Sequence, residues 1–185
     1  MTADARDPVT VRRSPTPALS AADLAQLLDL WHACWPDGEF TPEDAEHAMG
    51  GIHWIAEADG RVVAHVSVVP RTLEADGRPL ATGYVEAVAT HPGWRHRGLA
   101  TRLLQAAAAH ICDGFELGAL GTGVHGLYER LGWETWQGPT WVRTQAGLVR
   151  TADEDGYIMV LRTPRTPPLR GTEALSCDWR PGDAW

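Results

Sequence analysis

The stretch Arg95-His96-Arg97-Gly98-Leu99-Ala100 lies between a β-prone segment, residues 84–90, and a segment of strong helix formers, residues 101–110. The chain therefore runs from a strand through a basic, glycine-containing turn into a helix. The first turn of a helix has unpaired N–H groups and the positive end of the helix dipole, and together these bind phosphate oxygens. Gly98 lets the backbone approach such an anion closely. The stretch predicts a phosphate-binding turn, with an ordinary strand-to-helix turn as the alternative.

Composition places the chain among soluble globular proteins. It has 185 residues, 44% of them hydrophobic and 22% charged, which suits a single domain spanning residues 1–185. The net charge of −8 argues against nucleic acids and anionic membranes as partners and favours a cationic small molecule. No apolar run is as long as a membrane span, and Met1–Asp7 does not read as a secretory signal, so we expect a cytoplasmic protein.

The cysteines and histidines give no sign of a metal site. The three cysteines are scattered, and the eight histidines show no ligand spacing, so we expect buried, reduced thiols and no metal. Residues 121–126 match the dinucleotide-binding pattern Gly-x-Gly-x-x-Gly, but the following helix spans only about two turns and no βαβ unit surrounds it. We interpret these small residues as the lining of a cleft.

Hydrophobic periodicity and turn residues predict a mixed chain of helices and strands. Three consecutive strands separated by Asp-Gly turns predict an antiparallel meander, and Ser20 and Thr41 are typical helix N-caps. The expected strands are Pro8–Arg13, Ile52–Ala58, Arg61–Ala75, Leu80–Thr90, Phe115–Leu120, a segment from Trp133, and Tyr157–Leu161. Three of the expected helices begin after Ser20, Thr41 and Gly98, and a fourth spans Val124–Leu131. We expect residues 1–8 to be disordered and the tail, residues 164–185, to be ordered, because tryptophans occupy two of the last seven positions.

This element order, with the Arg-x-x-Gly-x-Ala turn between the fourth strand and the third helix, resembles the GNAT acetyltransferases. The resemblance implies the GNAT fold, an α/β (α+β) domain with a mixed, mostly antiparallel sheet of about seven strands and about four helices. It also implies acetyl-CoA as co-substrate, with the pantetheine arm lying where the fourth strand splays from the fifth. The implied cofactor-binding residues are Val88, Thr90, Arg95, His96, Arg97, Gly98, Leu99, Ala100 and Thr101.

The same resemblance implies three catalytic groups. The Val88 N–H would act as an oxyanion donor to the thioester oxygen. Tyr128 would act as a general acid towards the CoA sulfur, and Glu86 would attract the amine and relay its proton. The alternatives are a Tyr128 ring that only packs on the sheet and a Glu86 that only faces solvent.

Longer strings, from about Gly38 to the last residue, resemble the aminoglycoside 2′-N-acetyltransferases. These strings are residues 83–89, 116–120, 138–140, 153–156 and the closing 177–185. The resemblance implies acetylation of an aminoglycoside antibiotic at its 2′-amine, resistance to that antibiotic, and a homodimer. The implied substrate-binding residues are Glu39, Asp44, Glu86, Ala87, Gly121, Trp141, Arg143, Glu154, Asp183 and Trp185, the last through its free carboxylate.

Departures from that family bear on the substrate. Glu39 and Glu154 stand where the family commonly has aspartate, and Ala87 where it tends to have glycine. Trp141 and Arg143 add bulk and positive charge, which suits a drug that carries its own carboxylate, as kasugamycin does. We therefore expect either a kasugamycin-type or a 2-deoxystreptamine-type substrate.

Two rival functions remain open. A GNAT enzyme acting on another small amine, such as a polyamine, or on a peptide N-terminus would have an open, extended groove. A non-catalytic CoA- or drug-binding protein would bind ligands without turnover, and the presence of both Glu86 and Tyr128 argues against it.

Overall fold

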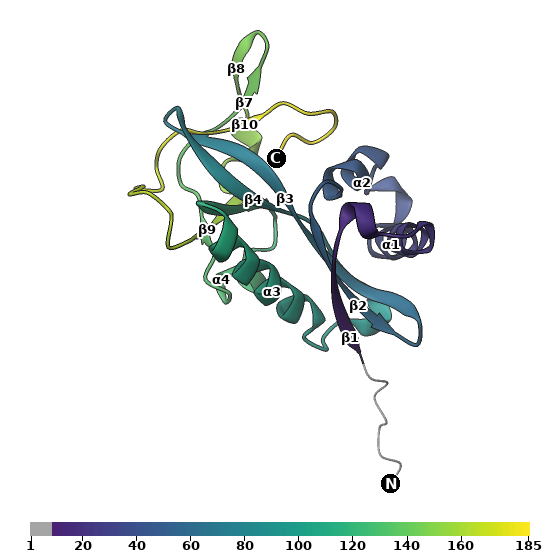
Figure 1. The fold of residues 1–185 in the computed structure, drawn as a ribbon. Coiled ribbons are helices and arrows are strands. Elements are labelled where there is room, and N and C mark those ends of the chain that lie inside the picture. Colours follow the sequence, from purple (N-terminus) through teal and green to yellow (C-terminus); the bar gives the residue numbers. More distant parts are fainter. Residues whose placement is uncertain (1–8) are drawn as a thin grey trace.

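The computed structural model describes residues 9–185, in which a ten-stranded mixed sheet is flanked by four α-helices. Helices α1 (Ala21–Cys34) and α2 (Pro42–Ala48) lie together beside β2 and β3, while α3 (Leu99–Gly114) and α4 (His125–Glu129) lie elsewhere along the sheet (Figure 1). The predicted disorder of residues 1–8 lies outside the described residues. Within the described part of the chain, no helix has both the length and the hydropathy needed to span a membrane.

The sheet confirms the expected mixed, mostly antiparallel α/β (α+β) architecture, with more strands than the sequence predicts. Its order is β6-β9-β5-β4-β3-β10-β7-β8, and β2 pairs with both β1 and β3. The extra strands come from short segments after Trp133 and from the tail. The strands are β1 (Thr10–Pro15), β2 (Ile52–Ala58), β3 (Arg61–Ala75), β4 (Arg78–Thr90), β5 (Leu117–Gly121), β6 (Glu134–Thr135), β7 (Thr140–Thr144), β8 (Gly147–Arg150), β9 (Ile158–Arg162) and β10 (Leu175–Asp178).

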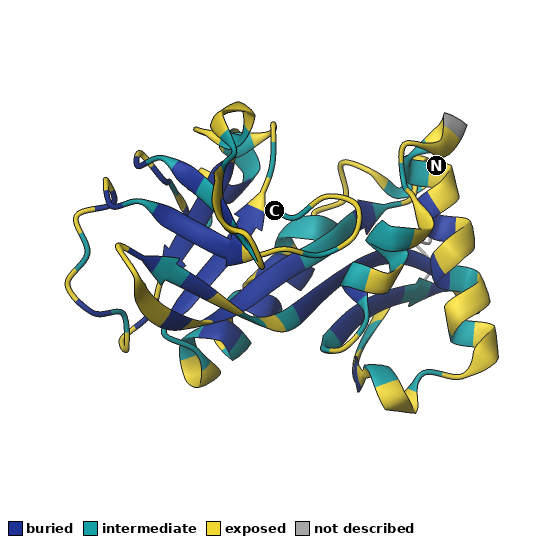
Figure 2. Cartoon of the chain, turned by 90° about the horizontal axis from the view of Figure 1, so that it is seen from above, coloured by how far each residue is buried: buried dark blue, intermediate teal, exposed yellow. Residues whose placement is uncertain are grey.

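Strand alternation separates the core into the two faces of the sheet. In β2, Trp54 joins the apolar cluster under α3, whereas its neighbour Ile55 joins the cluster under α1 and α2. Leu103 and Leu104 of α3 are both buried, and full burial of such a side chain stabilises the fold by about 2 kcal/mol. Figure 2 shows the result, with buried strands in the middle and exposed residues on the outer helix surfaces.

The helices differ at their N-termini. Ser20 and Asp23 form a capping box on α1, and Thr41 and Asp44 form one on α2. By contrast, α3 begins after Gly98, which has a φ of +75° and provides no side-chain cap. The N–H groups of the first turn of α3 are therefore left for another partner.

Two buried histidines form a hydrogen-bonded chain between β2 and β3. The Thr16 hydroxyl lies 2.8 Å from His53 Nε2, and His53 Nδ1 lies 2.9 Å from His65 Nε2. His65 Nδ1 lies 2.9 Å from the Ala87 carbonyl oxygen of β4. Burial lowers the pKa of His53 to about 4, with Arg12 adding to the effect. Burial, and then the neighbouring His53, lowers the pKa of His65 to about 3. Both imidazoles are therefore neutral at physiological pH.

These histidines make stability depend on pH. Their pKa values in the folded state lie below the ordinary value of 6.5, so the unfolded chain binds more protons as the pH falls below 6.5. The stability that they contribute is fully present above pH 6.5 and is lost towards the folded-state pKa values. From pH 6.5 to pH 5 we expect the two groups to lower the free energy of unfolding by about 3 kcal/mol.

Urea unfolding at several pH values measures this dependence. His65→Gln should remove about half of the loss, because one of the two titrating groups is gone. His32→Gln, on the exposed surface of α1, is the matched control and should leave the dependence as it is. An unchanged pH dependence in His65→Gln would contradict the assignment.

Candidate active site

The site lies where β4 and β5 stop pairing. Their parallel ladder covers only Thr82–Tyr84 of β4, and beyond Tyr84 the two strands are no longer paired. A cleft of about 530 Å³ opens there, walled by β4, the end of β5, α4 and the chain's C-terminal segment. It is lined by Trp35, Glu39, Phe40, Asp44, His47, Tyr84, Val85, Glu86, Ala87, Val88, Thr90, Ala100, Leu120, Gly121, Thr122, Val124, Leu127, Tyr128, Arg180, Asp183 and Trp185.

A β-bulge shapes the wall that β4 contributes. Ala87 and Val88 together face the single residue Val66 of β3, so one residue of β4 is left out of the ladder. Ala87 has a φ of +49°, a left-handed conformation that costs a residue with a Cβ about 1–2 kcal/mol. The bulge turns this part of β4 towards the cleft, and both of its residues line it.

The predicted phosphate-binding turn lies beside the cleft. His96 and Gly98 have φ values of +62° and +75°, so the backbone curls tightly before α3. The Arg97 guanidinium stacks on the Trp94 ring at 4.5 Å, and Arg95 Nε donates to the Thr90 carbonyl at 3.3 Å.

The predicted cofactor-binding residues fall into two groups. Val88, Thr90 and Ala100 line the cleft itself. The remaining predicted residues form the turn and the first turn of α3, where Leu99 is buried in the core. They are Arg95, His96, Arg97, Gly98, Leu99 and Thr101.

Glu86 is a buried carboxylate in the cleft with an ionic partner. Arg180 Nη1 donates to Glu86 Oε1 at 2.7 Å, and the two side chains are 16% and 14% exposed. Burial raises the pKa of Glu86 above its usual range, and the neighbouring Arg180 opposes that rise. Arg180 therefore favours the ionised form of a carboxylate that burial makes more basic.

Tyr128 lies in the same cleft, on α4. Its side chain is buried, and its ring packs edge-on against Trp133 with 6.2 Å between centroids. Burial raises the pKa of Tyr128 to about 12. The phenol therefore stays protonated at neutral pH and has a proton to give.

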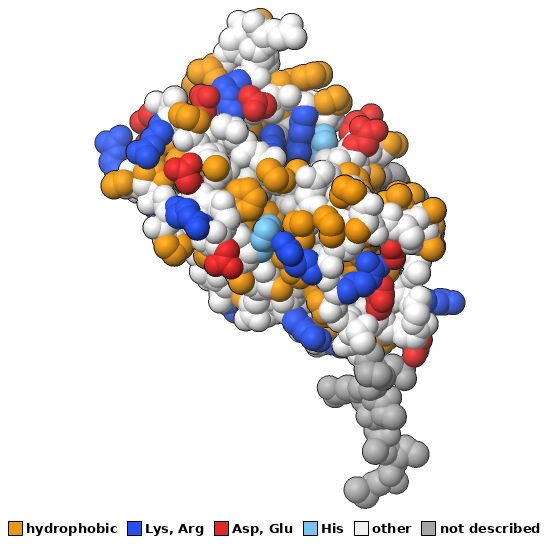
Figure 3. Space-filling view, in the orientation of Figure 1, with side chains coloured by type: hydrophobic (Ala, Val, Ile, Leu, Met, Phe, Trp, Pro, Cys, Tyr) orange, Lys and Arg blue, Asp and Glu red, His pale blue; other side chains and the backbone are white. Residues whose placement is uncertain are grey.

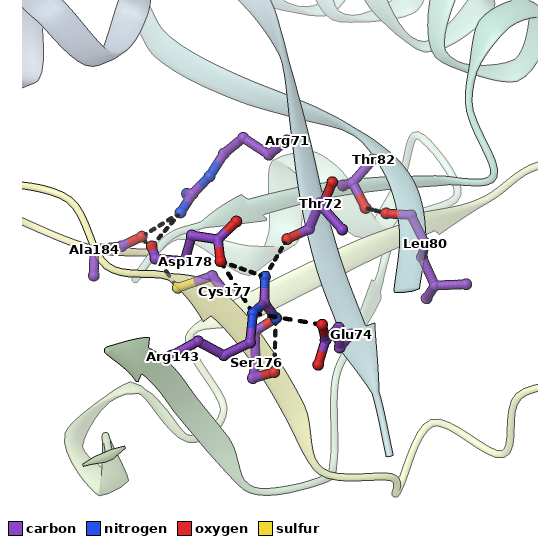
Figure 4. Close-up of polar contacts among 10 residues, drawn as sticks. All are labelled: Arg71, Thr72, Glu74, Leu80, Thr82, Arg143, Ser176, Cys177, Asp178 and Ala184. Carbon is purple, nitrogen blue, oxygen red and sulfur yellow. Dashed lines mark hydrogen bonds and ion pairs between the residues drawn. The ribbon is translucent and has the colours of Figure 1, made fainter. Parts of the chain in front are cut away.

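The C-terminal segment folds back against the cleft. Besides Glu86, Arg180 donates to the main-chain oxygens of Asp183, at 2.8 Å, and Trp185, at 3.2 Å. Arg71 Nη2 donates to the Ala184 carbonyl at 2.7 Å (Figure 4). This segment therefore forms one wall of the site, and Arg180 joins that wall to β4.

Among the cleft residues that were not predicted as site residues, two bear on binding, Arg180 and Tyr84. Arg180 belongs to a string that the sequence singles out, but Arg143 was the arginine expected to bind the substrate. The Tyr84 ring lies between two guanidinium groups, 4.5 Å from that of Arg71 and 5.8 Å from that of Arg180. Its hydroxyl is buried, and among the described residues it has no hydrogen-bond partner.

The predicted substrate-binding acids are mostly brought together. Glu39, Asp44 and Asp183 line the cleft, although Asp44 Oδ2 also accepts bonds from the Thr41 N–H and hydroxyl. Glu154 is not among the lining residues. Burial raises the pKa of Glu154, and the charge of nearby Asp183 adds to the rise. Ala87, Gly121 and Trp185, also predicted, line the cleft as well.

Trp141 and Arg143, also predicted to bind the substrate, are not among the residues that line the cleft. The Arg143 guanidinium donates to the Ser176 and Thr72 carbonyls at 2.7 Å each and pairs with Asp178 at 3.0 Å (Figure 4). Arg143 thus joins β3, β7 and β10. The Trp141 ring lies 5.5 Å from the Arg150 guanidinium instead.

Charge is mixed on one face of the outer surface. On the face drawn in Figure 3, acidic and basic side chains are interspersed and do not form a patch of one sign. Within residues 9–185, no three metal-ligating side chains gather to form a metal site.

The Arg180–Glu86 pair allows a direct test. We expect Arg180→Gln to raise the pKa of Glu86 further, because the opposing charge is lost while the burial remains. Carboxyl ¹³C NMR titration of the variant and the parent protein measures the shift. Arg143→Gln removes a guanidinium that also binds the C-terminal segment but does not touch Glu86, so it should leave this pKa in place. Equal titration of Glu86 in all three proteins would contradict the pairing.

Comparison with known proteins identifies relatives across most of the chain. Residues 17–136 match the family model described as the acetyltransferase (GNAT) domain. An aminoglycoside 2′-N-acetyltransferase from Mycolicibacterium fortuitum is 40% identical over 153 residues, which cover 80% of this chain and 78% of that protein.

Solved structures agree on the fold. A GNAT family N-acetyltransferase (YhbS) from Escherichia coli, in complex with CoA, is 16% identical with a TM-score of 0.67, covering 96% of this chain and 93% of that one. A GNAT family acetyltransferase from Brucella melitensis, in complex with acetyl-CoA, is 16% identical with a TM-score of 0.62, covering 92% and 96%.

Some solved relatives are much longer. A probable N-acyltransferase from Enterococcus faecalis is 16% identical with a TM-score of 0.58 over 70% of this chain, which spans only 33% of that one. The family match and the extended similarity in sequence nevertheless agree with the cleft geometry. The chain belongs to the GNAT family of acetyltransferases, enzymes that use acetyl-CoA as the acetyl donor.

Proposed function

We propose that this acetyltransferase transfers the acetyl group of acetyl-CoA to the 2′-amine of an aminoglycoside. The observation that carries the proposal is one cleft that holds Glu86 and Tyr128 together with the acidic residues Glu39, Asp44 and Asp183. A polycation is the substrate class that such a group of carboxylates attracts. The 40%-identical relative from Mycolicibacterium fortuitum, named as an aminoglycoside 2′-N-acetyltransferase, supports the same class and position.

The turn before α3 fits the pyrophosphate of acetyl-CoA. The N-terminus of α3 has no side-chain cap, and the left-handed residues His96 and Gly98 turn the backbone tightly in front of it. Free N–H groups and the helix dipole attract an anion there, and exposed Arg95 and Arg97 add positive charge. Val88 and Thr90 would hold the pantetheine arm in the gap beyond the β4–β5 ladder.

Three groups divide the chemistry of the transfer. Glu86 attracts the substrate ammonium and relays its proton, because its raised pKa makes it a stronger base than an ordinary glutamate. The Val88 N–H donates to the thioester oxygen as negative charge develops on it. Tyr128, protonated at neutral pH, gives its proton to the departing sulfur.

The substrate would meet Arg180 as it binds. In the structure the Arg180 guanidinium occupies one oxygen of Glu86, the carboxylate proposed to receive the substrate amine. The second oxygen of Glu86 remains for the substrate.

Both drug types stay compatible with the cleft. Arg143 no longer favours a drug with its own carboxylate, because its guanidinium is bound to β3 and β10. Arg180 does supply a guanidinium inside the cleft. Kasugamycin-type and 2-deoxystreptamine-type aminoglycosides both carry a 2′-amine, and an activity assay with both types decides which of them is the substrate.

Acetylation at this position would protect a cell from the drug. An amide carries no charge, whereas the amine that it replaces is protonated at neutral pH. Loss of one positive charge weakens the binding of a polycation to nucleic-acid phosphates. Antibiotic resistance is therefore the proposed cellular role.

Thiol release from acetyl-CoA tests the function directly. We expect turnover of the purified protein with at least one of kasugamycin, gentamicin, tobramycin and ribostamycin, and mass and NMR analysis should place the acetyl group on the 2′-nitrogen. Expression in a susceptible host should raise the inhibitory concentration of the same drug. No turnover across this panel, in a protein that binds acetyl-CoA, would contradict the proposal and favour a polyamine, a peptide N-terminus or a non-catalytic binding role.

Tyr128→Phe tests the general acid. We expect kcat to fall about 100-fold, because the phenol proton is lost while the ring packing against Trp133 is kept. Steady-state kinetics at neutral pH measures the effect. Tyr157→Phe, which changes an exposed tyrosine outside the cleft, is the matched control and should keep kcat. A near-normal kcat in Tyr128→Phe would show that Tyr128 only packs.

A further inference from the structure

In the hydrogen-bonded chain from Thr16 through His53 and His65 to the β4 bulge, every donor and acceptor role is fixed. The Ala87 carbonyl accepts only, so His65 Nδ1 carries a proton and donates to it. A neutral His65 therefore accepts at Nε2, which requires a proton on His53 Nδ1. His53 Nε2 then accepts from the Thr16 hydroxyl. Every tautomer in the chain is fixed by its final acceptor.

That final acceptor shares a peptide group with the proposed oxyanion donor. The Ala87 carbonyl and the Val88 N–H belong to the same planar unit, and in a trans peptide the two bonds point in opposite directions. His65 is buried on β3, the strand that pairs with one edge of β4, and Ala87 and Val88 line the cleft. A carbonyl held towards His65 therefore aims the Val88 N–H away from the core and towards the cleft.

The bulge has reason to need such an anchor. Ala87 lies in the left-handed region at a φ of +49°, and the extra residue of the bulge is not held by the ladder to β3. Without a bond to its carbonyl, this peptide group could rotate to relieve the strain. His65 is rigidly placed to prevent that, since its ring is buried and packs against Trp31 at 5.3 Å.

We propose that His65 is a positioning residue for acetyl transfer: through its bond to the Ala87 carbonyl it orients the Val88 N–H for the oxyanion, with His53 and Thr16 holding its tautomer. This proposal rests on the proposed function, because it assigns the oxyanion role to Val88. Hydrogen bonds in a chain also polarise one another, so a bonded Ala87 carbonyl makes the Val88 N–H a stronger donor.

Two reciprocal variants separate positioning from general stability. The side-chain amide of His65→Asn reaches the place of Nδ1 and keeps a donor for the Ala87 carbonyl, but loses the bond to His53. The longer side chain of His65→Gln reaches the place of Nε2, so it keeps a partner for His53 and loses the bond to Ala87. Both variants remove the ring, so both should lower the Tm.

We expect His65→Gln to lower kcat at least 10-fold, with KM for the aminoglycoside changed less than 3-fold, because the lost interaction acts on the developing oxyanion. His65→Asn should recover kcat to within about 3-fold of the parent protein, even where its Tm is no higher than that of His65→Gln. His110→Gln, which alters a histidine packed against Trp54 and Phe115 away from the cleft, is the control and should keep kcat.

The Val88 amide signal in ¹H–¹⁵N NMR spectra gives a second readout that needs no substrate. It should move in His65→Gln and stay near its parent position in His65→Asn. Three results would overturn the proposal. They are an equal kcat in the two variants, a loss of kcat/KM that comes from a higher KM, and a Val88 signal at the same position in His65→Asn and His65→Gln. If the parent protein acetylates no aminoglycoside, the proposed function fails while the NMR comparison still decides whether His65 orients this peptide.

Discussion

The short ladder between β4 and β5 is the constraint on which the site depends. Two parallel strands that pair for three residues and then part leave main-chain groups of β4 without a neighbour, and those groups then face a cleft. The bulge at Ala87 and Val88 lies in this part of β4, and Glu86 immediately precedes it. One backbone irregularity therefore places the carboxylate, the proposed oxyanion donor and the wall of the proposed pantetheine gap together. The ladder between β3 and β4 continues on both sides of the bulge and holds it in place.

The C-terminal segment supplies the second constraint. Its strand β10 pairs with the far end of β3 and with β7. Arg143 of β7 donates hydrogen bonds to both β10 and β3. From that attachment the chain returns to the cleft, where Arg180 bonds Glu86. An ion pair with both side chains largely buried contributes little net stability, because desolvation offsets the attraction. The pair places the segment against the cleft, and it favours the ionised form of a buried carboxylate.

Local patterns in the sequence predicted the fold well where structure depends on neighbours. The bounds expected for β2 and β3 agree with the structure, because Gly50-Gly51 precedes β2 and an Asp-Gly turn follows each of the two strands. The strand β10 was missed because its four residues pair with strands far away in the sequence. The contacts of Arg143 could not be predicted for the same reason, since its partners come from β3 and β10. His65 reads as an isolated polar residue in an apolar strand until its partners, 12 and 22 residues away, are seen. The homodimer and the cytoplasmic location stay predictions.

The uncapped start of α3 has a further consequence, for the stability of the folded chain. α1 and α2 satisfy their first turns with their own side chains, whereas α3 leaves its first turn open. A ligand that binds there binds the folded chain and not the unfolded one. At a free concentration 100 times its Kd, it adds about 2.7 kcal/mol to the free energy of unfolding. With acetyl-CoA bound there, as proposed, part of the folding stability would be set by the supply of this co-substrate, and a cell depleted of it would hold a less stable enzyme.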